Sequence, residues 1–360
     1  MNEELFINSQ VNFQTRGLIE NKISFSTDKI MKISRERSRF FFGYDFEKKE
    51  IAIYGKKSGT LNELKGSEHS SFFSHPRIKW TISNFSKIFT RGVHYFDFND
   101  GVSGEDLVSE EGILPTFQYN RKNFTSGAIL WPLSYYHDIG SSNFVGSSFC
   151  DTFSFEEKRS CIVWRGSIRG KNNAGENCGN ILKSLDSGLI SKEDAYRRML
   201  GISRFMAVER YAGMNFTDFA IVSKDRYAGM HEFYGNHRSD VLSKAELCSY
   251  KYLLALEGGD VATNFIWGAE TNSILFKQNY SWEVFYDTHF IPWIHYIPIK
   301  HDLSDLEEKF EFCERNTSLC KEIIHNAKSV CAMLSNRSLR QEALTRVINI
   351  YENIYRESQS

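Results

Sequence analysis

No CxxC pair occurs in this sequence, although it contains seven cysteines. A structural zinc site usually takes its ligands from such closely spaced cysteines, so we do not expect one. An odd number of cysteines without short spacings is typical of reduced thiols in a cytosolic protein. Cys313 and Cys320 lie two helical turns apart, which predicts that they share one buried helix face.

The sequence also lacks a surplus of positive charge. Its 44 Lys and Arg residues against 45 Asp and Glu residues give a formal net charge of −1. Proteins that bind nucleic acid usually carry a basic surplus that neutralises phosphates. Nucleic acid is therefore not expected as the main partner.

Long apolar runs are missing as well. The longest, such as Ala128 to Leu133, are far shorter than the roughly 20 residues that cross a bilayer. The first ten residues, MNEELFINSQ, are acidic and polar rather than basic and then apolar, so we expect no secretory signal. These features predict a cytoplasmic protein that could contact the inner face of a membrane.

What the sequence does contain is the composition of a globular protein, with 41% apolar and 25% charged residues. A length of 360 residues exceeds what one ordinary core supports and predicts two domains. The pattern becomes loop-like near residues 150–158. We therefore predict an N-terminal domain at 1–152, a second domain at 153–335 and a C-terminal helix at 336–360.

Short alternating runs predict strands in the first domain. Residues 39–44 and 50–54 flank a charged turn at 47–49, which indicates a hairpin. Residues 77–82 and 92–98 are further strand candidates, and the second of them leads into the turn Asn99-Asp100-Gly101.

In the second half, strand candidates alternate with helix candidates, which favours an α/β sheet. The predicted strands are 161–164, 219–222, 252–256, 273–276 and 294–299. The predicted helices are 191–205, 261–270 with Asp260 as its cap, and one opened by a capping box of Ser304 and Glu307. The last helix is expected to present one apolar face made of Leu344, Val347, Ile348, Tyr351 and Tyr355.

Polar residues directly follow two of these strands. After 161–164, Gly166 and Ser167 let the backbone approach a ligand, and cations that could meet a diphosphate follow: Arg165, Arg169 and Lys171. After 252–256, Gly258 and Gly259 permit unusual backbone angles. In an open α/β sheet, ligands bind beyond the carboxyl ends of strands. There Asp260 could contact a sugar hydroxyl, and Thr263 and Asn264 could reach a phosphate. The alternative for the first loop is an ordinary exposed loop with solvated cations, and the alternative for Asp260 is helix capping alone.

A third candidate is the acidic turn that contains Asp97 and Asp100. An exposed carboxylate just past a strand can accept a proton from an attacking hydroxyl. The two aspartates are three positions apart, so they do not form a DxD metal motif. The recurring histidines are expected in packing or on the surface rather than as metal ligands: His289, His295 and His301.

Taken together, these blocks resemble glycosyltransferase family 90. The similar segments are WRGS at 164–167, SYKYLLALEGGDVATNFIWGAETNSILF at 249–276, FIPWIHYIP at 290–298 and DLSDL at 302–306. The long block is most similar to the bacterial lipopolysaccharide-type branch, which is related to protein O-glucosyltransferases and capsule xylosyltransferases. The first half is similar only in the hairpin FFFGYDFEKKEIAIYG and the strand before Asp100.

The resemblance implies a GT-B architecture, in which two Rossmann-like domains face a cleft, with a C-terminal helix packing back on the first. It implies an inverting, metal-independent transfer without a cofactor, from UDP-glucose or UDP-xylose to a bacterial surface glycan such as lipopolysaccharide. Asp100 is the best match to the family's catalytic base, with Asp97 as the alternative. Animal members carry an arginine near the position of Asn264, so a different cation would have to meet the diphosphate here: Arg165, Arg169 or Lys277.

Two other classes of function stay open at this point. A glycoside hydrolase would use two carboxylates, for instance those of Asp100 and Glu270. A non-catalytic glycan-binding module would account for the abundant aromatic residues, 29 Phe and 17 Tyr.

Overall fold

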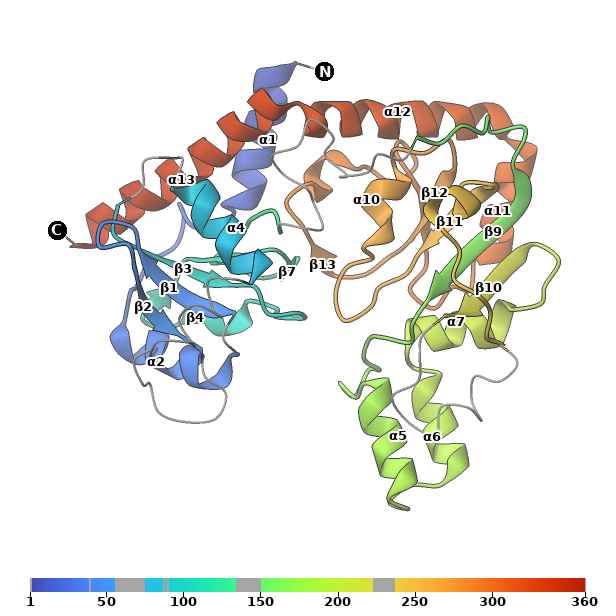
Figure 1. Ribbon diagram of the computed structural model, residues 1–360, viewed down its shortest axis with the longest axis horizontal. Coiled ribbons are helices and arrows are strands. Elements are labelled where there is room, and N and C mark those ends of the chain that lie inside the picture. The colour runs from blue at the N-terminus through green and yellow to red at the C-terminus, as the bar shows by residue number, and fades with distance from the viewer. Residues whose placement is uncertain are drawn as a thin grey trace. The chain divides into compact units, whose positions relative to one another are not determined.

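The computed structural model describes residues 2–38, 40–55, 75–86, 88, 91–133, 150–222 and 237–359. The chain divides into two compact units (Figure 1). Unit 1 comprises Met1–Gly146, Ser281–His289 and Ala332–Ser360, and unit 2 comprises Ser147–Tyr280 and Phe290–Cys331. Unit 1 is therefore assembled from three separate segments of the chain.

A five-stranded sheet forms the centre of unit 2. The strands follow the order β10-β9-β11-β12-β14, and every neighbouring pair is parallel. Their bounds are β9 Arg159–Gly166, β10 Thr217–Ile221, β11 Tyr250–Ala255, β12 Ile274–Gln278 and β14 Ile297–Ile299. Each overlaps one of the five predicted strands, and the α/β class is confirmed.

The strand order contains a reversal next to β9. From β9 the chain crosses to β10 on one side, and it then returns to place β11 on the other side. Open α/β sheets bind ligands at such a switch point, outside the carboxyl ends of the strands. The segments that follow β9 and β11 are thus the natural place to look for a site in unit 2.

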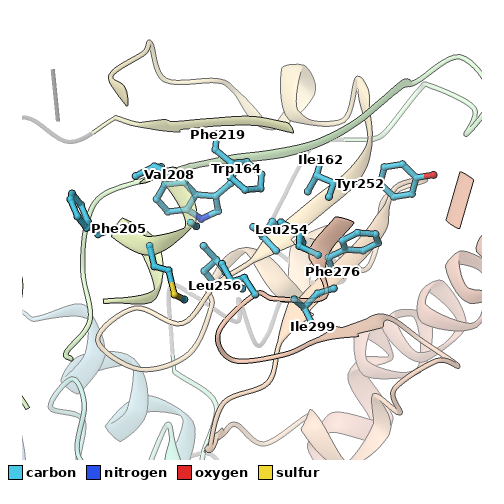
Figure 2. Packing of buried hydrophobic residues seen from close by; sticks show 14 of the residues in the cluster. Ile162, Trp164, Phe205, Val208, Phe219, Tyr252, Leu254, Leu256, Phe276 and Ile299 are labelled. Carbon is cyan, nitrogen blue, oxygen red and sulfur yellow. The ribbon is translucent and has the colours of Figure 1, made fainter. Parts of the chain in front are cut away.

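The core of unit 2 lies on one face of this sheet and is formed by alternate residues of each strand. Figure 2 shows Ile162 and Trp164 of β9 beside Tyr252 and Leu254 of β11 in one apolar cluster. Phe205 and other residues of α7 (Ser203–Tyr211) pack against this cluster. Burying a large apolar side chain stabilises a fold by roughly 1.5–3 kcal/mol, so this layer holds α7 firmly on the sheet.

The remaining helices of unit 2 connect these strands. They are α5 Cys178–Asp186, α6 Lys192–Met199, α9 Lys244–Leu247, α10 Asn264–Gly268, α11 Leu306–Arg315 and the start of α12 Thr317–Ser335. The single helix predicted at 191–205 is wrong, since the chain turns at Gly201 between α6 and α7. A Cβ on Gly201 would lie 2.8 Å from the Cβ of Asn172, so this close approach requires glycine.

Two predicted helix caps are also wrong. The helix α10 begins only at Asn264, so the capping position belongs to Thr263 rather than Asp260, and Thr263 makes no side-chain cap hydrogen bond. In α11 the capping position is Asp305, whose Oδ1 accepts a hydrogen bond from Lys300 N at 2.9 Å instead. Cys313 and Cys320 are both buried, as predicted, but they do not share one helix face, since Cys313 lies in α11 and Cys320 in α12. The thiol of Cys320 donates to Cys313 O at 3.6 Å.

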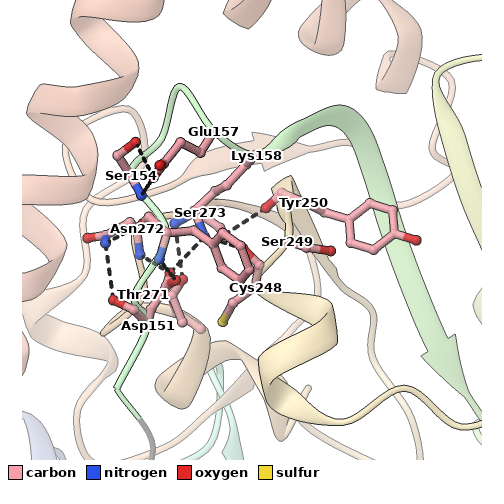
Figure 3. A network of polar contacts seen from close by, with 12 residues as sticks. Asp151, Ser154, Glu157, Lys158, Cys248, Ser249, Tyr250, Thr271, Asn272 and Ser273 are labelled. Atoms are coloured by element: carbon pink, nitrogen blue, oxygen red, sulfur yellow. Dashed lines mark hydrogen bonds and ion pairs between the residues drawn. The ribbon is translucent and has the colours of Figure 1, made fainter.

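A buried polar network lies at the opposite, amino-terminal edge of the sheet (Figure 3). Lys158 Nζ lies 2.8 Å from Asp151 Oδ2 and also donates to the carbonyl of Cys248. The same carboxylate oxygen accepts a hydrogen bond from Asn272 N at 2.7 Å. Because these residues precede β9, β11 and β12, the network connects the starts of three strands.

Unit 1 contains a mixed sheet in the order β2-β1-β3-β6-β8. Its strands are β1 Phe41–Asp45, β2 Glu50–Tyr54, β3 Val93–Asp97, β6 Thr116–Gln118 and β8 Ala128–Leu130. The predicted hairpin is confirmed as β1 and β2, although Arg39, where it was expected to begin, lies outside the described residues. The short turn between β1 and β2 can only join antiparallel strands, and β1 is also antiparallel to β3. This sheet therefore differs from the expected parallel Rossmann-like arrangement.

Short elements and helices complete unit 1. They are α1 Glu3–Gln14, α2 Thr27–Glu36, α4 Pro76–Phe85, η1 Glu105–Leu107, β4 Val108–Ser109, β5 Gly112–Ile113, β7 Arg121–Lys122, β13 Trp282–Glu283, η3 Asp287–His289 and α13 Arg337–Gln359. The strand predicted at 77–82 is wrong, because Pro76 at the first turn and the His75 cap start a helix. Its buried residues Ile78, Thr81 and Phe85 follow helical spacing.

The C-terminal helix α13 contacts α1 within unit 1. Four residues of its predicted apolar face are buried: Leu344, Val347, Ile348 and Tyr351. The fifth, Tyr355, is half-buried and packs against Phe25. Within the described ranges, no helix is long and apolar enough to cross a membrane.

Candidate functional site

Two glycine-containing loops meet at the carboxyl edge of the unit 2 sheet. Gly170 follows β9 with φ +118°, and a Cβ on it would lie 2.8 Å from the carbonyl oxygen of Gly258, which follows β11. Only glycine adopts this backbone conformation readily and allows such a close contact. Both loops are candidate sites by their sequence, and the structure brings them together at the switch point.

Arg204, which sequence reasoning missed, links these loops from the first turn of α7. Its guanidinium donates hydrogen bonds to Glu257 O at 2.9 Å, to Leu256 O at 3.3 Å and to Ser167 O at 3.1 Å. Burial, helped by the nearby positive charge of Arg169, lowers the pKa of Arg204 to about 10. No motif marks this residue in the sequence, because its partners lie in two distant loops.

Arg165 is occupied by the sheet rather than available to a ligand. Its side chain is only 8% exposed and pairs with Asp218 of β10, with Nη2 2.6 Å from Oδ1 and Nη1 2.7 Å from the Asp218 carbonyl. The other carboxylate oxygen of Asp218 accepts a hydrogen bond from the Tyr250 hydroxyl. The expectation that Arg165 faces a diphosphate therefore does not fit its surroundings.

Asn264 is likewise used inside the fold. Its Nδ2 donates to Leu254 O at 2.9 Å and so anchors α10 to the end of β11. Thr263 is exposed, and α10 is only five residues long. Lys277 lies with Nζ 4.6 Å from the centroid of the Phe265 ring and near two tyrosine rings, a cation–π arrangement that directs its charge toward aromatic residues.

Arg169 and Lys171 are exposed cations of this edge, and both lie in the loop after β9. Gly166 ends β9, and Ser167 is half-buried with its carbonyl bound to Arg204. Asp260 is half-buried and close enough to Arg204 to favour the charged guanidinium. The edge thus combines cations and backbone groups with the acidic side chain of Asp260.

Further polar contacts at this edge join the loop after β11 to the ends of β12 and β14. Glu257 Oε1 lies 3.1 Å from His301 Nε2, and Glu257 N donates to Gln278 Oε1 at 3.1 Å. Gln278 Nε2 in turn donates to His301 O at 2.6 Å. These contacts fix the backbone of the loop after β11 without using the glycines.

In unit 1, the two candidate bases differ sharply in their surroundings. Asp97 is 1% exposed; its Oδ2 pairs with Arg37 Nε at 2.9 Å, and its Oδ1 accepts from the Asn99 amide side chain at 2.6 Å. Burial raises the pKa of Asp97, although Asn99 and Arg37 oppose the shift. Asp100 instead has a side chain that is 63% exposed.

The histidines predicted to be packing or surface residues are indeed used in this way. His289 is buried and stacks on Phe6 with ring centroids 3.8 Å apart, and His295 accepts a hydrogen bond at Nδ1 from Ile291 N at 2.8 Å. Across the described ranges, no group of three or more His, Cys, Asp or Glu side chains is placed to hold a metal ion. Glu270 lies in unit 2, where burial raises its pKa.

The segment from β10 into α13 matches a known family. Residues 216–345 fit the model described as Glycosyl transferase family 90. This part of the chain is a family 90 domain. The resemblance stated from the sequence is thereby confirmed, and the domain contains the loop after β11 and its residues Gly258 and Asp260.

Relatives of the family 90 domain include enzymes and viral proteins. O-glucosyltransferase LpsA of Dichelobacter nodosus is 36% identical over 93 residues, which are 26% of this chain and 29% of that protein. Protein O-glucosyltransferase 1 of Rattus norvegicus is 37% identical over 76 residues, 21% of this chain and 19% of that protein. Uncharacterized protein 035R of Invertebrate iridescent virus 3 is 31% identical over 90 residues, 24% of this chain and 8% of that protein.

The similarity is therefore confined to part of each relative, since these three matches cover 8 to 29% of the relatives' lengths. The loop after β9 and the acidic turn of unit 1 both lie outside residues 216–345.

Proposed function

We propose that this chain is an inverting glycosyltransferase that moves a sugar from a UDP-sugar to a hydroxyl group of a bacterial surface glycan such as lipopolysaccharide. Glucose is the preferred sugar, since two of the similar proteins are named O-glucosyltransferases, and xylose is the second candidate. The proposal places the reaction in the cytoplasm, with contact to the inner face of the membrane where a lipid-linked acceptor would lie.

One observation carries the proposal: a family 90 domain contributes one of the two loops that meet at the sheet's switch point. Nucleotide ligands of open α/β sheets bind at this position. Arg169 and Lys171 in the partner loop supply exposed positive charge, and Ser167 and Gly170 supply backbone that a phosphate can approach. Asp260 is suited to accept a hydrogen bond from a ribose or sugar hydroxyl.

The reaction itself needs a base and a stabilised leaving group. The acceptor oxygen attacks the anomeric carbon, the bond from that carbon to the diphosphate oxygen breaks, and the acceptor's proton passes to a carboxylate. Attack from the face opposite the diphosphate inverts the anomeric configuration. Charge builds on the departing UDP, and the cations at the carboxyl edge would stabilise it in place of a metal ion. No cofactor is required for this chemistry.

Asp100 is the better candidate for the base. Its carboxylate is exposed, whereas both oxygens of Asp97 are engaged by Arg37 and Asn99. A general base must reach the proton that it accepts, and an exposed oxygen meets this condition while a buried, ion-paired one does not.

Nucleotide binding and release test the proposal. Thermal unfolding with UDP, GDP, CMP and their sugars identifies the nucleotide, because a ligand at a thousand times its dissociation constant adds about 4 kcal/mol to stability. UDP release from UDP-glucose or UDP-xylose, dependent on an added glycan acceptor, is the expected activity. Cleavage of glycan without any nucleotide would indicate a hydrolase, and UDP binding without turnover of any sugar would indicate a binding module.

A further inference from the structure

Arg204 belongs to neither glycine loop, yet it contacts both. An arginine side chain has five N–H donors, and at least three of them bind carbonyls on either side of the switch point, at Ser167, Leu256 and Glu257. These carbonyl oxygens would otherwise present partial negative charge at the edge where the diphosphate is proposed to bind. Arg204 covers them and keeps its own positive charge at that place.

The packing around Arg204 explains one of the glycines. A Cβ on Gly258 would lie 2.7 Å from Arg204 Nη2, and the carbonyl oxygen of Gly258 would lie 2.8 Å from a Cβ on Gly170. α7 therefore packs on the loop after β11, which in turn packs on the loop after β9, and Arg204 also contacts the loop after β9 directly at Ser167 O. A change at Arg204 should be transmitted through this stack to both loops.

Charged groups of both signs lie near Arg204. Asp260 and Glu257 favour the charged guanidinium and Arg169 opposes it, while Glu257 is also engaged by His301. A charge that is largely buried acts through a lower effective dielectric than an exposed charge, and salt screens it less. Arg204 should thus attract an anion differently from the exposed Arg169.

We propose that Arg204 is a positioning residue for the donor diphosphate: it joins the two loops in the geometry that receives the phosphates and adds a poorly screened positive charge beneath them. The inference rests on the proposed function and deepens it, since it makes the preferred ligand one that carries a diphosphate rather than a nucleoside alone.

Calorimetric titration of the full chain with UDP and with uridine tests this role. Arg204→Met is expected to weaken UDP binding by about tenfold or more, the range for a lost interaction with a charged group, and to leave uridine binding within about twofold. Arg204→Lys should recover part of the loss, because it keeps the charge but not the fork of donors. Arg197→Met is the matched control, since Arg197 on α6 is 77% exposed and pairs only with Asp194 among the described residues.

The salt dependence of UDP binding distinguishes the effect of a buried charge from that of an exposed charge. The loss of UDP affinity in Arg169→Met should shrink when the salt concentration rises from about 0.05 to 0.5 M, whereas the loss in Arg204→Met should persist. Equal UDP affinity in Arg204→Met and the unchanged chain would overturn the inference. If the unchanged chain binds no nucleotide at all, the proposed function itself fails.

A double substitution tests the packing without any ligand. Gly258→Ala should lower the melting temperature because its new methyl group meets Arg204, and the same change should cost clearly less in an Arg204→Ala background, where that contact is gone. Equal losses in both backgrounds would contradict the proposed stack. If Arg204→Met folds poorly, the melting temperatures still test the stack, and Arg204→Lys then serves for the comparison of UDP binding.

Discussion

Arg77 donates a hydrogen bond from Nη1 to Asp100 Oδ1 at 2.9 Å, and the Tyr119 hydroxyl lies 3.1 Å from the same oxygen. Arg77 also donates to the carbonyl of Phe98, directly after β3. Among the described residues, we find no hydrogen bond to Oδ2 of Asp100. One oxygen therefore fixes the orientation of the carboxylate, while the side chain as a whole remains exposed.

Replacing Asp100 by Asn removes the proposed base but keeps an oxygen that Arg77 can bind. Transfer should fall by roughly 10²- to 10⁴-fold, the range for loss of a general base, while UDP binding changes little. Initial rates of UDP release and calorimetric titration measure the two effects. Equal loss of binding and transfer would mean that Asp100 has a structural role.

Asp97→Asn should affect stability instead. The buried carboxylate is replaced by a neutral amide, which can still accept one hydrogen bond but no longer balances the charge of the Arg37 guanidinium, at a cost of roughly 1–3 kcal/mol. Arg37 keeps its second partner, Asp106, which limits the loss. Denaturant unfolding should show a lower midpoint, with turnover per folded molecule unchanged. A loss of turnover in fully folded protein would instead favour Asp97 as the base.

Gly170→Ala should weaken UDP binding more than Gly175→Ala does. Both glycines have positive φ, +118° and +79°, so both substitutions strain the backbone. Only at Gly170 does the new methyl group meet another chain segment, the carbonyl of Gly258, because nothing lies within 4 Å of a Cβ on Gly175. Titration of both variants with UDP measures the difference. Similar affinities would show that the loop contact does not shape the site.

Asp151→Ala should destabilise unit 2 strongly. The side chains of Asp151 and Lys158 are 3% and 0% exposed, so the substitution leaves a buried ammonium without its counter-ion. Removing one partner of a buried pair costs about 3–5 kcal/mol. Urea unfolding of this variant, with the exposed Glu157→Ala as control, measures the loss. The double variant Asp151→Ala/Lys158→Met should recover part of the stability, and an unchanged midpoint in the single variant would contradict the role given to this pair.

His94 should make the protein sensitive to acid. It is fully buried against the Tyr351 ring at 4.5 Å, and burial lowers its pKa to about 3. Below the ordinary histidine pKa of about 6.5, the unfolded chain takes up a proton that the folded chain does not. The contribution of His94 is therefore complete above about pH 6.5 and is lost as the pH falls towards 3, by about 2 kcal/mol between pH 7 and 5.

His94→Phe tests this contribution, because it keeps an aromatic ring at the position and removes the titration. Unfolding free energies at pH 7 and pH 5 should differ less for this variant than for the unchanged chain. An equal difference in the two proteins would mean that other groups account for the acid sensitivity.

Local pattern was enough to predict much of the fold. Short apolar runs located all five strands of the unit 2 sheet, and the charged turn at 47–49 located the hairpin of unit 1. These features depend on the residues within one element, so the sequence contains what is needed to predict them. The strand predicted at 77–82 failed because its apolar residues also fit helical spacing, and the cap at His75 decided between the two.

The sequence by itself determined the α/β class, the glycines of the two loops and the similarity to family 90, because each depends on residues that are close together in the chain. The tertiary structure decided which charged groups are occupied inside the fold. Arg165 and Asp218 are 53 residues apart, as are Arg204 and Glu257, and only the packed sheet brings each pair together. A side chain's partner is fixed by the three-dimensional contacts around it, and for these arginines those contacts come from distant segments.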